Sequence, residues 1–297
     1  LAQVFFERLL TSTGRTIFSM TSQLTGAITN IILDPILIFG LLGAPKMGVT
    51  GAAVATVIGQ CVAALVAGFC NHRYNHDVKL KFHGFRLDFH IIGTIYAVGI
   101  PTIIMQSMSS VMCFGINKLL LDFSTTSTAV FGAYFKLQTF LYLTGNGVVQ
   151  GMRPLIGYNY GAGESKRVRE IFRSALVLIA GVMVIGTILC MAVPQTLIGL
   201  FTSNPETIQF GKEALRLISI GFIASSVSVT VSGALEGLGK GKESLVISVL
   251  RYIAVILPLA FILSRILGAA GVWHAFWITE VVVAGISYVI CKKEIFQ

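Results

Sequence analysis

The feature that most constrains this sequence is a succession of apolar runs, each long enough to cross a lipid bilayer as a helix. The hydrocarbon core of a membrane is about 30 Å thick, so a spanning helix needs about 20 apolar residues. Short polar segments separate the runs, which cover residues 16–41, 49–70, 91–121, 127–151, 172–193, 210–236, 244–265 and 271–291. The sequence therefore predicts an all-α membrane protein, a polytopic bundle of about eight transmembrane helices.

The composition supports lipid as the surrounding solvent. Hydrophobic residues make up 55% of the 297 residues and charged residues only 12%, whereas soluble domains carry about 25% charged residues. The formal net charge is +9, but the cations lie in short loops between apolar runs, as membrane topology requires. This distribution argues against nucleic acid as a partner.

Lys and Arg alternate between rich and poor loops along the chain. The rich segments are those before residue 16, between 71 and 90, between 152 and 173, between 237 and 243, and after 291. Cytoplasmic loops carry the excess of Lys and Arg in membrane proteins. We therefore expect a multi-pass protein of the cytoplasmic (inner) membrane with both ends of this chain in the cytoplasm.

The most polar stretch is residues 71–90. His72 and His76 are four residues apart, a spacing that could hold a metal on a helix, but no third ligand follows at an obvious spacing. We interpret the stretch as a cytoplasmic linker and expect no metal site. Its second half, 80–89, is amphipathic and is expected to lie along the inner membrane surface before the next helix.

The sharpest candidate site is Asn30-Ile-Ile-Leu-Asp34-Pro35, inside the first apolar run. A carboxylate within a membrane segment is costly unless it faces a polar cavity or a partner. Asn30 and Asp34 are four residues apart and share a helix face, and Pro35 frees the carbonyl of Ile31 by lacking an N–H. This group predicts a cation or proton site, and the alternative is a structural kink.

Other polar residues lie inside the apolar runs. Gln106, Tyr134, Lys136, Gln138 and Tyr142 are interpreted as lining a substrate cavity. The role of Lys136 stays open, because a buried cation repels cationic compounds unless it is paired or deprotonated.

Arg251 and Glu280 lie in the last two runs. They are interpreted as a structural ion pair that satisfies both charges away from lipid. A cavity or gating role is the alternative.

Several segments, in order, resemble the MATE (multidrug and toxic compound extrusion) family, in particular its bacterial MepA-like branch. The Asn30–Phe39 and Gly51–Thr56 segments resemble the fifth and sixth helices of that family. Gly99-Ile-Pro101, Pro154–Gly163 and Gly237-Leu-Gly239 resemble the seventh-helix entry, the eighth-helix ending and the loop after the tenth.

The resemblance implies part of a fold of twelve helices in two six-helix lobes around a central cavity. The chain would be a fragment lacking roughly the first four helices, with residues 1–15 as the tail of an earlier segment and a loop. Residues 1–70 would end the N-lobe, 71–90 would link the lobes, and 91–297 would form the C-lobe.

The resemblance also implies a function. Family members export cationic, amphipathic compounds in exchange for protons or sodium, and are not enzymes. In several members the Asn and Asp matching Asn30 and Asp34 belong to an N-lobe cation site, which also uses an acid from the first helix. Some members place an acid in the seventh helix, where Gln106 is the nearest polar residue here. We expect small cationic drugs and lipid as partners, no cofactor beyond the coupling ion, and a monomer.

Two other functions stay open. A lipid-linked oligosaccharide flippase shares the wider superfamily architecture, although its cavity should be strongly basic and few cations here could face inward. A membrane-embedded enzyme is the alternative of another class, but the sequence contains neither HExxH nor GxSxG.

Overall fold

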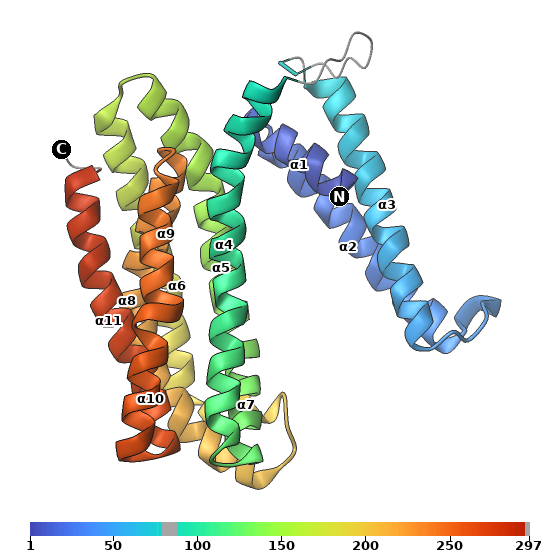
Figure 1. The fold of residues 1–297 in the computed structure, drawn as a ribbon. Coiled ribbons are helices and arrows are strands. Elements are labelled where there is room, and N and C mark those ends of the chain that lie inside the picture. The colour runs from blue at the N-terminus through green and yellow to red at the C-terminus, as the bar shows by residue number, and fades with distance from the viewer. Residues whose placement is uncertain (76, 79–87, 295–297) are drawn as a thin grey trace. The chain divides into compact units, whose positions relative to one another are not determined.

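The computed structural model describes residues 1–75, 77–78 and 88–294, and these ranges contain helices and no strand (Figure 1). Two short turns, the 3-10 helix η1 (Leu41–Gly43) and the π-helix η2 (Leu250–Ala254), accompany the α-helices. The α-helices are α1 (Ala2–Ser12), α2 (Thr16–Phe39), α3 (Val49–Tyr74), α4 (Phe89–Leu121), α5 (Thr125–Gly161), α6 (Ser165–Ala192), α7 (Pro194–Gly199), α8 (Pro205–Gly237), α9 (Gly241–Val249), α10 (Ile256–Leu267) and α11 (Ala269–Glu294).

Seven helical segments in the described ranges are long and apolar enough to cross a membrane. They are α2, α3, α4, α6, α8, the continuous segment Gly241–Leu267, and α11. The expected span at 127–151 lies within α5, which has 37 residues but is less apolar. Helix α5 is less apolar because one of its faces carries Gln138, Thr139 and Asn146 toward a cavity, while it packs against α6 and α8.

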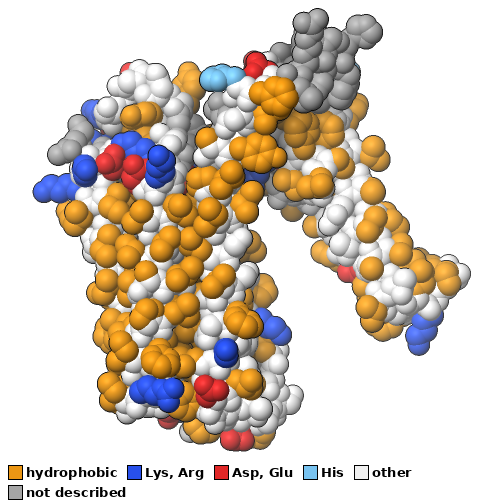
Figure 2. Space-filling model, viewed as in Figure 1, with side chains coloured by type: hydrophobic (Ala, Val, Ile, Leu, Met, Phe, Trp, Pro, Cys, Tyr) orange, Lys and Arg blue, Asp and Glu red, His pale blue; other side chains and the backbone are white. Residues whose placement is uncertain are grey.

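The surface of the second part of the chain is that of a lipid-facing bundle. Figure 2 shows apolar side chains over the middle of its helices, and Lys, Arg, Asp and Glu gathered toward the helix ends. Large exposed hydrophobic residues occur along several helices, for example Val177, Leu178 and Ile185 of α6. Such a band matches the hydrocarbon core of a bilayer.

The chain divides into two compact units, unit 1 (Leu1–Leu87) and unit 2 (Asp88–Gln297). The assignment of these parts to an N-lobe and a C-lobe remains a prediction. The amphipathic stretch expected at 80–89 lies outside the described residues except for Asp88 and Phe89. Asp88 caps α4, because its carboxylate accepts hydrogen bonds from the backbone N–H groups of His90 (2.8 Å) and Ile91 (3.3 Å).

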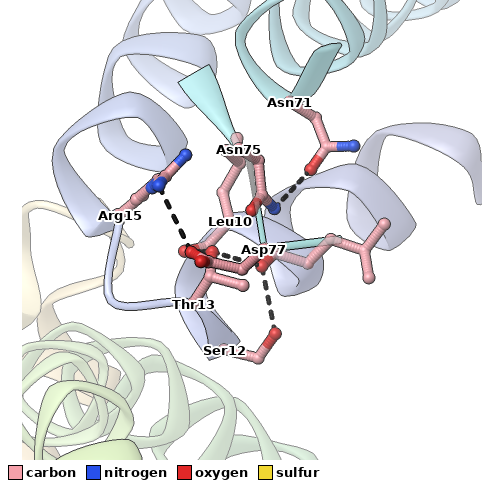
Figure 3. Close-up of polar contacts among 8 residues, drawn as sticks. Leu10, Ser12, Thr13, Arg15, Asn71, Asn75 and Asp77 are labelled. Carbon is pink, nitrogen blue, oxygen red and sulfur yellow. Dashed lines mark hydrogen bonds and ion pairs between the residues drawn. The ribbon is translucent and has the colours of Figure 1, made fainter. Parts of the chain in front are cut away.

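In unit 1, α2 and α3 form a hairpin, and α1 packs on α3 through Leu10, Ala67 and Cys70. Figure 3 shows the polar contacts near the α1–α2 turn and the end of α3. Arg15 at the start of α2 pairs with Asp77 at 3.2 Å, and Asn75 donates to Asn71 at 2.8 Å. The Arg15–Asp77 pair connects the α1–α2 turn to the segment after α3, and the Asn75–Asn71 hydrogen bond lies at the end of α3 itself.

Helix α8 lies at the centre of unit 2 and is rich in small polar residues. Several of their hydroxyl groups are satisfied within the helix, since Ser225 donates to the carbonyl of Phe222 at 2.7 Å and Thr230 to that of Ser226 at 2.7 Å. A Cβ at Gly221 would lie 2.9 Å from the Cα of Trp277 in α11. Small residues thus let α8 approach its neighbours closely, as in other membrane bundles.

The segment from α9 to α10 is interrupted in its middle by η2. The N–H of Val255 donates to the carbonyl of Leu250, five residues back, at 3.0 Å. Pro258 follows in α10 and has no N–H for the carbonyl of Ala254, one turn earlier, so the helix lacks a second regular hydrogen bond here. Single π-turns of this kind occur frequently at functional sites, and η2 carries Arg251.

Candidate functional site

The predicted cation-site residues lie together in unit 1, on α2 and α3. The side-chain amide of Asn30 donates to Asp34 Oδ1 at 3.3 Å and to Thr56 Oγ1 at 3.4 Å. Asn30 and Asp34 are half-buried. Pro35 follows inside α2, so the group combines a carboxylate, an amide, a hydroxyl and a helix turn with a freed carbonyl.

Close packing of α2 against α3 brings Asn30 to Thr56. A Cβ at Gly26 would lie 2.7 Å from the Cβ of Ala63 and 2.9 Å from the carbonyl oxygen of Gly59. A Cβ at Gly59 would lie 2.8 Å from the carbonyl oxygen of Gly26. Real Cβ atoms do not approach so closely, so glycine at both positions is what allows the two helices to meet here.

Unit 1 also contains a buried acid that the sequence analysis missed. Glu7 of α1 is only 8% exposed and lines an open hollow of about 340 Å³ with Asn30 and Thr56. The signal was present, since Glu7 stands within the apolar stretch Val4-Phe-Phe-Glu-Arg-Leu-Leu10. An interpretation of residues 1–15 as a tail and a loop gives Glu7 no helix to be buried in, whereas residues 2–12 form α1.

Unit 2 contains a separate cavity of about 240 Å³ between α4, α5, η2, α10 and α11. Three of the residues predicted to line a substrate cavity, Gln106, Gln138 and Tyr142, line this cavity, and so do Arg251 and Glu280. That a substrate binds there remains a prediction. The remaining described lining residues are Met105, Ser109, Met112, Phe135, Thr139, Leu143, Asn146, Tyr252, Ile256 and Phe276.

The structure brings Arg251 and Glu280 into contact, 29 residues apart in sequence. Arg251 donates to Glu280 Oε1 from Nε at 2.9 Å and from Nη2 at 2.7 Å. Its Nη2 also donates to the hydroxyl of Tyr142 at 2.7 Å, and the guanidinium carbon lies 5.1 Å from the centre of the Tyr142 ring. The arginine is 7% exposed. The Glu280 carboxylate of α11 neutralises its buried charge, and the Tyr142 hydroxyl of α5 accepts a further hydrogen bond from it.

Tyr134 and Lys136 are not among the residues that line this cavity. Tyr134 is 1% exposed and packs in the aromatic core against Phe222 and Phe276. Lys136 is exposed, and its Nζ lies 5.7 Å from the centre of the Phe201 ring.

Helical geometry explains this difference. Residues 135, 138, 139, 142 and 146 of α5 line the cavity and follow the spacing of one helix face. Positions 134 and 136 lie on either side of that face.

No group of three or more His, Cys, Asp or Glu residues that could hold a metal occurs in the part of the chain that the structure describes. His72 lies at the end of α3. Its possible partner His76 lies outside the described residues, so the structure does not test that pair.

Comparison with known proteins assigns the chain to a family. A family model described as MatE matches residues 101–262. The multidrug export protein MepA of Staphylococcus aureus (strain MSSA476) is 26% identical over 276 residues, which is 92% of this chain. The chain spans 59% of the length of that relative.

Two solved structures share the fold. A MATE crystallised in complex with MaL6 superposes with a TM-score of 0.90 at 22% identity, over 99% of this chain and 66% of that one. A mutant of the Vibrio cholerae MATE transporter VcmN gives 0.88 at 23% identity, over 99% of this chain and 67% of that one. Because the family model matches more than half of its residues, the chain belongs to the MatE family, whose members are membrane transporters and not enzymes.

Proposed function

We propose that the protein is a cation-coupled antiporter that exports cationic, amphipathic compounds across the cytoplasmic membrane. The observation that carries this proposal is the cluster of Asn30, Asp34 and Thr56, which lies on two membrane-spanning helices. An ionised carboxylate inside a bilayer is energetically costly, and binding of a proton or a cation lowers that cost. The description of the S. aureus relative as a multidrug export protein supports the same activity.

The exported compound is proposed to bind in the unit 2 cavity, and the protein to act as a monomer. Aromatic rings and two methionines supply an adaptable apolar wall, and Gln106 and Gln138 supply polar contacts. The charge of Arg251 is compensated by Glu280, so the cavity does not carry the excess positive charge that would repel a cation.

A lipid-linked oligosaccharide flippase is the second candidate of the same superfamily. Binding a phosphate-linked lipid calls for uncompensated Arg or Lys, because each phosphate group carries negative charge. The described lining of the unit 2 cavity contains one basic residue, Arg251, which is paired. This pairing favours the antiporter.

Dye efflux tests the proposed function directly. Cells that express the protein should expel a cationic dye such as ethidium faster than control cells, and an ionophore that collapses the driving proton or sodium gradient should reduce efflux to the control rate. The coupling ion is identified by which ionophore is effective. Efflux that persists after both gradients are collapsed would contradict antiport.

The proposed orientation places the loops around residues 166 and 241, and both chain ends, in the cytoplasm. In a cysteine-free background we expect an impermeant maleimide to label Ser203→Cys in intact cells, and Ala162→Cys only after lysis. Both positions are exposed in the structure, so accessibility to water alone does not distinguish them. Labelling of Ala162→Cys from outside would reverse the orientation.

A further inference from the structure

We infer that the first turns of α6 bind the phosphate headgroup of an anionic phospholipid, and that an acyl chain of this lipid lies along the exposed face of the same helix. Only the choice of the cytoplasmic leaflet rests on the orientation proposed above, because the binding itself is argued from residues within unit 2. The lipid site is separate from the Asn30–Asp34 group and from the unit 2 cavity, and no step of the proposed antiport depends on it.

The first turns of α6 border an open hollow of about 440 Å³. Its described lining residues all belong to α6, and the polar ones are Ser165, Lys166, Arg169, Glu170 and Arg173. Three basic side chains and one acid give this lining an excess of two positive charges. Arg and Lys side chains are the usual ligands of phosphate groups in proteins, so the hollow has the charge and the donors that a phospholipid headgroup requires.

Lys166 and Arg173 form no ion pair with a residue that the structure describes, and both are exposed. Lys240 provides the contrast, because it pairs with Glu294 at the end of α11. Figure 1 shows the α5–α6 turn at the same end of unit 2 as the start of α9 and the end of α11. Residues 166, 169 and 173 share one helix face, where like charges destabilise each other. A bound phosphate offsets that repulsion.

The same face of α6 becomes apolar as the helix continues into the bilayer. Val177, Val184 and Ile188 follow Lys166 and Arg173 at the spacing of one helix face, and all three are exposed. The buried residues of α6 lie on the opposite side of the helix, which packs against α5 and α8. From 173 to 184 the helix rises about 16 Å, close to half of a hydrocarbon core of about 30 Å. The apolar part therefore matches the depth of one leaflet.

A phospholipid is the occupant that uses both parts of this face. Its phosphate lies at the level of the bilayer surface, which the long side chains of Lys and Arg at helix ends reach. Its acyl chain contacts the apolar part, whereas a free phosphate uses the basic part alone. Anionic phospholipids give the cytoplasmic leaflet a negative surface potential that attracts clustered Lys and Arg. Charge complementarity thus favours an anionic headgroup over a zwitterionic one.

Thermal unfolding of the purified protein in detergent, with lipid added, tests the inference. The melting temperature should rise more with phosphatidylglycerol than with phosphatidylcholine of the same acyl chains, and KCl should reduce the difference by screening the charges. The double variant Lys166→Gln with Arg173→Gln should fold, because both side chains are exposed. Its apparent affinity for phosphatidylglycerol should be at least about tenfold weaker, because two cationic ligands are lost.

The control is a second double variant, Lys242→Gln with Lys292→Gln. It removes two positive charges from exposed positions at the same end of unit 2 that do not line the hollow, and it should keep the affinity of the wild type. An equal loss of affinity in this control would reveal a diffuse surface charge and overturn the site. Equal responses of the wild type to the two lipids, or a full response to phosphatidylglycerol in the 166/173 variant, would also overturn it.

Two further measurements complete the test. Arg173→Gln alone should weaken phosphatidylglycerol binding in the same direction by a smaller factor, which keeps the test decisive if the 166/173 variant does not fold. If sn-glycerol 3-phosphate alone raises the melting temperature as much as phosphatidylglycerol does, the ligand is a soluble anion and lipid docking is wrong. Dye efflux reports the proposed antiport separately, so failure of either idea is distinguished from failure of the other.

Discussion

Asp34→Asn is expected to abolish ion-driven efflux while leaving the protein folded in the membrane. Asn has the same shape as Asp but is fixed in the neutral state, so it cannot exchange a proton or a cation. It also keeps an oxygen that can accept the 3.3 Å hydrogen bond from Asn30. The variant thus removes the exchangeable charge and preserves the local packing of α2 against α3.

The expected mechanism begins with the cost of the ionised carboxylate inside a bilayer. Binding of a cation or proton at Asp34 reduces that cost and allows α2 to repack around Pro35, where the helix lacks one backbone hydrogen bond. That repacking is proposed to weaken binding of the exported compound and favour its release outside.

Dye efflux and membrane expression should be measured together for this variant. Asn30→Ala serves as the matched change on the same helix face and should impair efflux less, because it removes a dipole and not the charged group. A well-expressed Asp34→Asn variant with wild-type efflux would leave Asp34 as a structural residue next to a kink.

Removing one member of the Arg251–Glu280 pair is expected to destabilise unit 2 by about 3–5 kcal/mol. Either single change leaves a buried charge without its partner, and loss of Glu280 leaves Arg251 with only Tyr142 as a described side-chain hydrogen-bond acceptor. Glu280→Gln and Arg251→Met should both lower the thermal stability and the expressed amount. The measurement is thermal unfolding of the purified variants, with expression recorded in parallel.

The charge swap Arg251→Glu with Glu280→Arg should recover more stability than either single change, because it restores the opposite charges. Recovery should be incomplete, since the hydroxyl of Tyr142 would lose its arginine donor. Arg15→Met provides a control, because Arg15 pairs with Asp77 at 3.2 Å and the Asp77 side chain that it leaves behind is 65% exposed. Exposed pairs contribute about 0–1 kcal/mol. Two single variants at 251 and 280 with normal stability would contradict the structural importance of the buried pair.

Much of the helical architecture was predictable from local sequence patterns. Apolar runs of about 20 residues imply spanning helices, because every backbone polar group must be satisfied in lipid. The same reasoning identified Asp34, Arg251 and Glu280 as polar residues in need of partners. The α5 segment at 127–151 was also expected as a helix, although its polar cavity face leaves it less apolar than the seven segments that meet the spanning criterion.

The sequence by itself established a helical membrane protein, the family resemblance and the residues whose burial needs an explanation, because helix periodicity and apolar length are local properties. Only the tertiary structure decided which helix faces meet. It placed Glu7 of α1 beside the hollow that contains Asn30, brought Arg251 on a π-turn to Glu280 and Tyr142, and left Tyr134 and Lys136 outside the cavity lining. Helix spacing defines the faces of each helix, but the packing of residues far apart in the chain determines what each face contacts.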